Sequence, residues 1–82
     1  MIQRYIAAAL ARAHYELIED QEPYYGEIPA LNGVWATGPT LEECRANLES
    51  ALEDWLLFSI ANGFEVPELD GVAIALPNRV AV

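Results

Sequence analysis

The run from Tyr24 to Trp55 (YYGEIPALNGVWATGPTLEECRANLESALEDW) constrains the fold more than any other part of the chain. Two short segments, 24–28 and 34–37, alternate between side chains expected to face in and side chains expected to face out, as half-buried strands do. Between them lies Asn32-Gly33, a turn signal because both residues tolerate positive φ. The run therefore predicts two consecutive strands that are paired in antiparallel fashion.

A long helix is predicted directly after these strands. Thr40 is placed as its N-cap and Glu43 follows three residues later, which together make a capping box. Asn62-Gly63 is a typical end signal, with Phe64 positioned to fold back onto the last turn. Apolar side chains recur within the helix at spacings of three and four, which predicts one buried stripe. The stripe comprises Leu41, Cys44, Leu48, Ala51, Leu52, Trp55, Leu56, Ser59 and Ile60.

The flanking segments complete an α+β prediction. Alanine-rich residues 2–13 predict a further helix, and 14–18 alternate as a first strand. Residues 72–76 are apolar on both faces, as expected for a covered fourth strand. We thus expect a three-stranded antiparallel meander, a long helix packed on one sheet face, a fourth strand and an extra N-terminal helix. The chain, 1–82, is one domain with an N-terminal helix extension (1–13), a β-β-β-α-β core (14–76) and a tail (77–82).

The second face of this sheet also needs a cover. Its expected side chains include Tyr25, Glu27 and Trp35, because alternation places them opposite the helix-covered face. Either the N-terminal helix or another chain is expected to lie there. A chain of 82 residues buries only roughly 60% of its unfolded surface, which also favours oligomerisation or partner docking.

The charge of the chain is strongly asymmetric. Residues 1–13 carry two arginines and no acid, whereas the remaining residues carry all thirteen acids and two arginines, a net −11. Such a surface repels phosphate backbones and attracts basic partners, although acids also serve simply to maintain solubility. No apolar run reaches the ~20 residues that cross a bilayer. Together with the single Cys44, this predicts a cytoplasmic protein that has no disulfide and does not enter a membrane.

No reaction centre is recognisable. Cys44 falls on the apolar stripe and His14 is the only histidine, so neither a nucleophile–base pair nor a metal site is expected. No glycine-rich phosphate loop is present, and no cofactor is expected. The order of elements also resembles the opening of the ribonuclease H fold, for which Glu16 and Glu27 are candidate metal ligands. The last predicted strand contains no acid, with Asp70 only in the preceding loop, so a non-enzymatic role is favoured.

The motif Tyr24-x-Gly26-x-Ile28-Pro29-x-Leu31-x-Gly33, followed by Thr37-Gly38-x-Thr40-x-Glu42-Glu43, resembles the HicB-type antitoxins. The resemblance covers roughly residues 15–60. Two positions differ: Ala30 replaces an acidic residue and Asn32 a proline. The family has a partial ribonuclease H-like fold without the nuclease carboxylates. Many members also carry a C-terminal DNA-binding segment, which is not recognisable here, so no direct DNA binding is expected.

The resemblance implies a non-catalytic antitoxin that binds and neutralises a small basic HicA-type ribonuclease. The acidic charge of the chain agrees with such a partner. Tyr25, Glu27 and Trp35 are the candidate partner-binding residues, because aromatic side chains often anchor interfaces. Alternatively, these residues are buried under the first helix or against a second subunit. A different alternative for the whole protein is an orphan oligomeric HicB-like domain with another regulatory protein-binding role.

Overall fold

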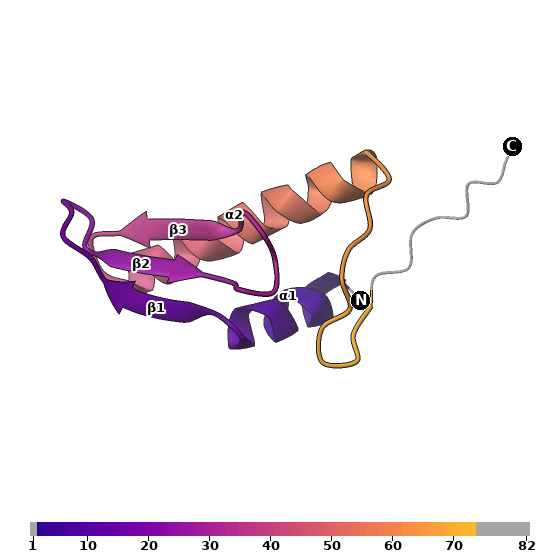
Figure 1. Cartoon of the computed structure of the whole chain (residues 1–82), viewed down its shortest axis with the longest axis horizontal. Coiled ribbons are helices and arrows are strands. Elements are labelled where there is room, and N and C mark those ends of the chain that lie inside the picture. Colours follow the sequence, from indigo (N-terminus) through magenta and orange to yellow (C-terminus); the bar gives the residue numbers. More distant parts are fainter. Residues whose placement is uncertain (1, 74–82) are drawn as a thin grey trace, which may run out of the picture.

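The computed structural model of the chain describes residues 2–73. Within them the fold is α+β, as predicted (Figure 1). The elements in order are α1 (Ile2–Ala11), β1 (His14–Leu17), β2 (Tyr24–Glu27), β3 (Trp35–Gly38) and α2 (Leu41–Ala61).

The three strands form the predicted antiparallel meander, with the spatial order β1-β2-β3. Glu27 of β2 pairs with His14 on one side and with Trp35 on the other, and this register fixes which side chains share a face. The turn between β2 and β3 lies where the sequence predicts it, with Gly33 at φ +86°. The Val34 amide donates to the Leu31 carbonyl within this turn at 3.3 Å, so β3 begins at Trp35, one residue later than predicted.

Helix α2 begins and ends at the predicted signals. The Thr40 side chain accepts a hydrogen bond of 3.1 Å from the Glu43 amide, which satisfies a free donor of the first turn. At the other end Gly63 adopts φ +70°, and the Phe64 amide donates to the Ser59 carbonyl at 2.8 Å. The ring of Phe64 lies 5.8 Å from that of Phe58, so the predicted fold-back onto the last turn is confirmed.

Most of the predicted stripe of α2 faces the sheet or α1 and contributes to the core. Ala36 of β3 lies under this helix, and the turn residues Ile28, Leu31 and Val34 extend the core beyond the strands. Leu41 is an exception, since it is about half exposed in the first turn of the helix. The buried members of the stripe are Cys44, Leu48, Leu52, Leu56 and Ser59.

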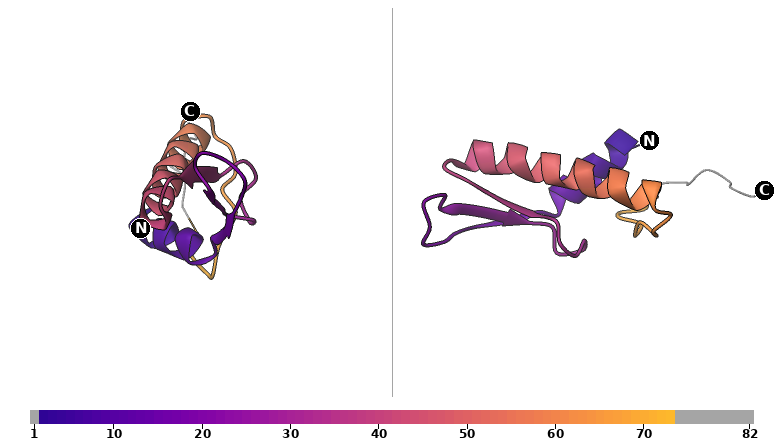
Figure 2. Two further views of the ribbon diagram at one scale, coloured as in Figure 1. Left: turned by 90° about the vertical axis from the view of Figure 1, so that its left-hand side faces the viewer. Right: turned by 90° about the horizontal axis from the view of Figure 1, so that it is seen from above.

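Helix α1 does not cover the second face of the sheet. It lies on the same side as α2, beyond the end of the strands, and contacts α2 alone among the other helices and strands (Figure 2). Its buried residues Tyr5 and Ala9 join the core formed by α2. The expectation that Tyr25 or Trp35 is buried under the first helix is therefore wrong. The helix is also two residues shorter than predicted, because the amides of Arg12 and Ala13 bond three residues back.

The fourth strand predicted for 72–76 is not seen in the described part of the chain, and 74–76 lie outside it. Val72 instead forms an isolated bridge with Leu69, with amide-to-carbonyl distances of 2.7 and 3.0 Å. Asp70 and Gly71 between them both have positive φ, the signature of a tight two-residue hairpin turn. Local turn geometry therefore supplies the partner of Val72. Neither helix of the described residues has the length and apolar character needed to cross a membrane.

Candidate partner-binding face

The sheet face opposite α2 is uncovered, and we call it the open face. Two cross-strand rows of side chains form it, because partners in register lie on the same side of a sheet. No helix of the described residues contacts it, since α2 packs on the other face and α1 packs on α2. The open face comprises His14, Glu27 and Trp35 in one row and Glu16, Tyr25 and Thr37 in the next.

An aromatic pair lies across β2 and β3 on this face. The rings of Tyr25 and Trp35 are 6.1 Å apart between centroids and inclined by 26°, so they are stacked. The indole remains 55% exposed, whereas the phenol of Tyr25 is half-buried. A large, preorganised apolar surface is therefore presented directly to solvent.

Carboxylates surround the aromatic pair. The Tyr25 hydroxyl donates to Glu27 Oε1 at 3.0 Å, which fixes both side chains along β2. Burial raises the pKa of Tyr25, and the hydrogen bond to Glu27 and the charges of Glu27 and Glu16 raise it further. Beside them, the Thr37 hydroxyl donates to Glu22 Oε1 at 2.7 Å. The aromatic pair thus lies in a field of negative charge.

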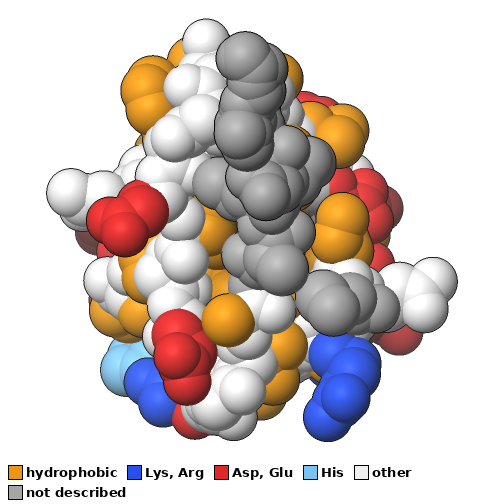
Figure 3. Space-filling view, turned by 90° about the vertical axis from the view of Figure 1, so that its right-hand side faces the viewer, with side chains coloured by type: hydrophobic (Ala, Val, Ile, Leu, Met, Phe, Trp, Pro, Cys, Tyr) orange, Lys and Arg blue, Asp and Glu red, His pale blue; other side chains and the backbone are white. Residues whose placement is uncertain are grey.

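Positive charge lies elsewhere in the described residues. Arg4 belongs to α1 and Arg45 to α2, while Arg12 forms a salt bridge with Asp70 of the 69–72 hairpin. Viewed from the end of the molecule that carries this hairpin, arginine side chains appear only along the lower edge (Figure 3). No arginine or lysine of residues 2–73 is a member of the open face, where His14 is the only basic side chain.

The other candidate chemistries receive little support from the geometry. Cys44 is 0% exposed, and its thiol donates weakly to the Ala36 carbonyl at 3.6 Å. Burial raises the pKa of this thiol, with a further contribution from the charge of Glu22. Between residues 2 and 73, no three side chains of His, Cys, Asp or Glu are grouped so as to hold a metal ion. Asp70, the third candidate nuclease ligand, is held by Arg12.

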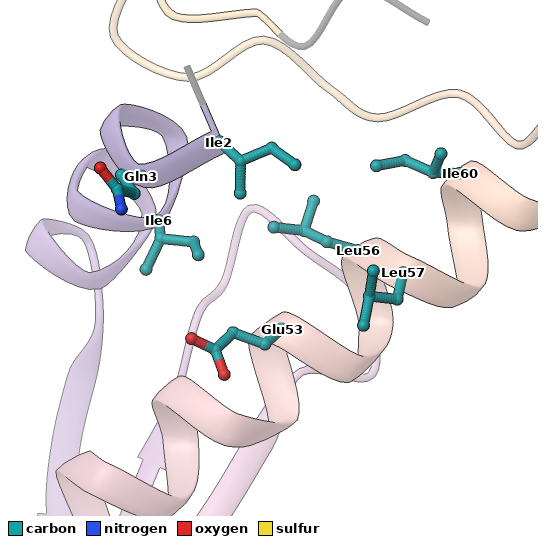
Figure 4. A pocket seen from close by; sticks show the side chains of 7 residues that line it. All are labelled: Ile2, Gln3, Ile6, Glu53, Leu56, Leu57 and Ile60. Carbon is teal, nitrogen blue, oxygen red and sulfur yellow. The ribbon is translucent and has the colours of Figure 1, made fainter.

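A second surface lies between the two helices. This helix groove, of about 280 Å³, is mainly apolar, and the side chains of α1 and α2 face one another across it (Figure 4). Leu57, which lines this groove, is 64% exposed, in agreement with its absence from the predicted buried stripe. The groove is lined by Ile2, Gln3, Ile6, Glu53, Leu56, Leu57 and Ile60.

Comparison with known proteins identifies the family. The model of the UPF0150-like family matches residues 4–67. The chain belongs to the UPF0150-like family. Its sequence is 62% identical to that of TTHA0281 from Thermus thermophilus, whose crystal structure aligns with a TM-score of 0.89 over 93% of this chain and 94% of that one. A comparison with curated proteins gives no match.

In this UPF0150-like protein, the three predicted partner-binding residues Tyr25, Glu27 and Trp35 lie together on the open face. Alternation along each strand was sufficient to group them. His14 and Glu16 were not among the predicted partner-binding residues, because their place beside Glu27 and Tyr25 depends on the register of β1 against β2. The polar–apolar alternation of residues 14–18 was the only local signal for that strand.

Proposed function

We propose that this UPF0150-like protein is a HicB-like antitoxin. In this proposal it carries out no chemistry itself and works in the cytoplasm, where it binds a small basic ribonuclease and occupies the surface that would hold RNA. One observation carries the proposal: the open face combines the exposed Trp35 and its partner Tyr25 with Glu16 and Glu27, and contains no lysine or arginine among the described residues.

The charge of the whole chain supports the same partner. At a formal net charge of −9, the protein attracts a cationic ribonuclease from solution and repels nucleic acid. Aromatic side chains supply the buried anchors that protein interfaces require, and the acids around them provide complementary charge. The resemblance of the strand–turn–helix motif to HicB-type antitoxins points in the same direction. Direct DNA binding by this chain is not expected.

Co-expression with the small basic protein encoded beside this chain tests the proposal. We expect the two to co-purify and growth to be restored when the ribonuclease is toxic alone. Trp35→Ala should abolish rescue, whereas Leu57→Ala, which alters the helix groove, should preserve it. Absence of a basic neighbour, or of rescue by the unaltered protein, would refute the antitoxin role. The reverse pattern of the two variants would assign binding to the groove.

The helix groove favours a second candidate, an orphan oligomeric domain with another regulatory protein-binding role. Exposed apolar side chains such as Leu57 and Ile2 are typical of surfaces that become buried on association. Light scattering after size-exclusion chromatography would separate the two cases. A stable oligomer that Leu57→Glu converts to a monomer, combined with no ribonuclease binding, would favour this second function.

A further inference from the structure

We propose that the open face recognises an arginine side chain of its protein partner, with the guanidinium stacked on the Trp35 indole and bonded to the carboxylate of Glu27, while Glu16 adds negative charge on the far side of Tyr25. The inference rests on the proposed function insofar as a basic ribonuclease presents that arginine. It concerns the chemistry of the site, however, and is testable with peptides alone.

The exposed indole of Trp35 offers a surface on which a guanidinium can stack. A guanidinium within about 6 Å of an indole centroid is attracted to the face of the ring, and tryptophan is the best aromatic residue for this contact. Trp35 is 55% exposed and its ring is held by the stack with Tyr25. Little conformational freedom remains to be lost when a flat group docks on it.

Carboxylates lie beside both rings of the aromatic pair. Glu27 is the direct cross-strand partner of Trp35, and Glu16 is the direct partner of Tyr25. Each direct pair is separated by about 5 Å at Cβ, so Glu27 lies within reach of a group stacked on Trp35. Glu16 lies beside Tyr25, one strand further away, and contributes through its charge. Although Glu27 Oε1 accepts the Tyr25 hydroxyl, a carboxylate has roughly four acceptor sites, so capacity for a guanidinium remains.

Other occupants fit this face less well. A second copy of the chain, packed face to face, would bring two acidic open faces together in a protein of net charge −9. RNA bases could stack on Trp35, but the adjacent phosphates would meet the same acids. A lysine ammonium is strongly hydrated and does not stack, whereas a planar guanidinium both stacks and forms paired hydrogen bonds. The arrangement therefore favours arginine.

The test uses Trp35 as a reporter. In the Trp55→Phe protein, Trp35 is the sole tryptophan, so its emission reports on the open face. Two capped octapeptides serve as probes, one with four arginines and one with lysines at the same positions. We expect saturable quenching by the arginine peptide and binding about fivefold tighter than for the lysine peptide. Equal affinities, or binding that leaves the emission unchanged, would overturn the proposal.

Charge-matched variants separate a specific site from general attraction. In the same Trp55→Phe background, Glu16→Gln with Glu27→Gln should weaken arginine-peptide binding about tenfold, and Glu49→Gln with Glu53→Gln on exposed positions of α2 should weaken it about twofold. Equal losses in the two double variants would overturn the proposal. Circular dichroism would verify that both remain folded, and amide shifts on titration should concentrate at 14–16, 25–27 and 35–37.

The outcomes also separate this inference from the antitoxin role. If the arginine peptide binds as expected but no basic ribonuclease is neutralised, the antitoxin role fails and the arginine site stands. If the ribonuclease is neutralised equally well by the Glu16→Gln and Glu27→Gln double variant, the antitoxin role stands and the arginine site fails.

Discussion

Gly38 shows how a single hydrogen in place of a side chain shapes the fold. A Cβ atom at this position would lie 2.5 Å from the backbone nitrogen of Cys44 and 2.8 Å from its Cα. The first turn of α2 therefore rests directly on the end of β3, and this close contact sets the distance between the helix and the sheet. A comparable approach occurs at Gly26, where a Cβ would meet the ring of Tyr15 at 2.7 Å.

We expect Gly38→Ala to lower the free energy of unfolding by about 3 kcal/mol, because helix backbone has to move to admit the methyl group. Gly63→Ala is the matched control. Gly63 has φ +70° but open space around it, so alanine there incurs only the cost of a left-handed conformation, about 1 kcal/mol. Urea unfolding of both variants measures the difference. A larger loss for Gly63→Ala would contradict the close contact at Gly38.

Cys44 provides a chemical reporter at the same contact. Its thiol is fully buried and its pKa is raised from the ordinary 9.0, so the folded protein retains the unreactive neutral form. We expect labelling by a thiol reagent to be at least about a hundredfold slower in the native protein than in urea. The folded state has the raised pKa and therefore favours the neutral thiol. The stabilisation that results is complete below the thiol pKa of the unfolded chain and is lost as pH rises through the pKa of the folded protein. Equal labelling rates with and without urea would refute this burial.

At the scale of elements, α1 joins the body of the protein through one residue in particular. Tyr5 is completely buried within the core, and its hydroxyl donates to the Pro67 carbonyl in the segment that follows α2. Ala9, one turn later, is equally buried and allows the helix to approach α2 closely. The helix and the 64–73 segment therefore stabilise each other, and neither is an independent appendage.

Tyr5→Ala should lower the free energy of unfolding by about 4 kcal/mol, since a large core side chain is removed. Tyr5→Phe, which loses only the hydrogen bond, should cost about 1 kcal/mol. Ala7→Ser on the exposed side of α1 is the control and should change stability by less than about 0.5 kcal/mol. Amide hydrogen exchange provides the second measurement. Faster exchange restricted to α1 in Tyr5→Ala, with the rest unchanged, would show that the helix is dispensable.

For the molecule as a whole, the two helices and the sheet form two layers with different surfaces at opposite faces. The open face is acidic and aromatic, while the helix groove is mainly apolar. Only one long-range salt bridge ties the described chain together: Arg12, just after α1, holds Asp70 in the 69–72 hairpin. The side chains are about half exposed, so the bridge contributes modestly to stability.

The Arg12–Asp70 bridge should make the free energy of unfolding decrease as the pH is lowered. Its hydrogen bond lowers the pKa of Asp70 from 3.8, so the stabilisation is present above the unfolded pKa and is lost as pH falls through the folded one. Near pH 7, we expect Asp70→Asn to have a lower urea midpoint of unfolding than the unaltered protein. At about pH 2, we expect the two midpoints to be equal. Glu68→Gln controls for the loss of one negative charge. A deficit that persists in acid would show that the bridge is not its cause.

Local features of the sequence determined most of the elements. The capping box at Thr40, the Asn32-Gly33 turn and the alternation of β2 and β3 each act within a few residues, so reading them along the chain was enough. The same alternation placed Tyr25, Glu27 and Trp35 on one face. Four of the six side chains of the open face belong to these two strands and were thus predictable from their alternation, Thr37 being the fourth.

Only the tertiary structure decided what covers each face. The sequence shows that α1 has an apolar stripe, but Tyr5 finds its partners in the core formed with α2 and at Pro67, 62 residues away. Likewise, Val72 was predicted to join the sheet and instead pairs with Leu69 across a tight turn. Periodicity identifies the side of an element that must be buried, whereas the choice of neighbour depends on contacts between distant segments that compete in three dimensions.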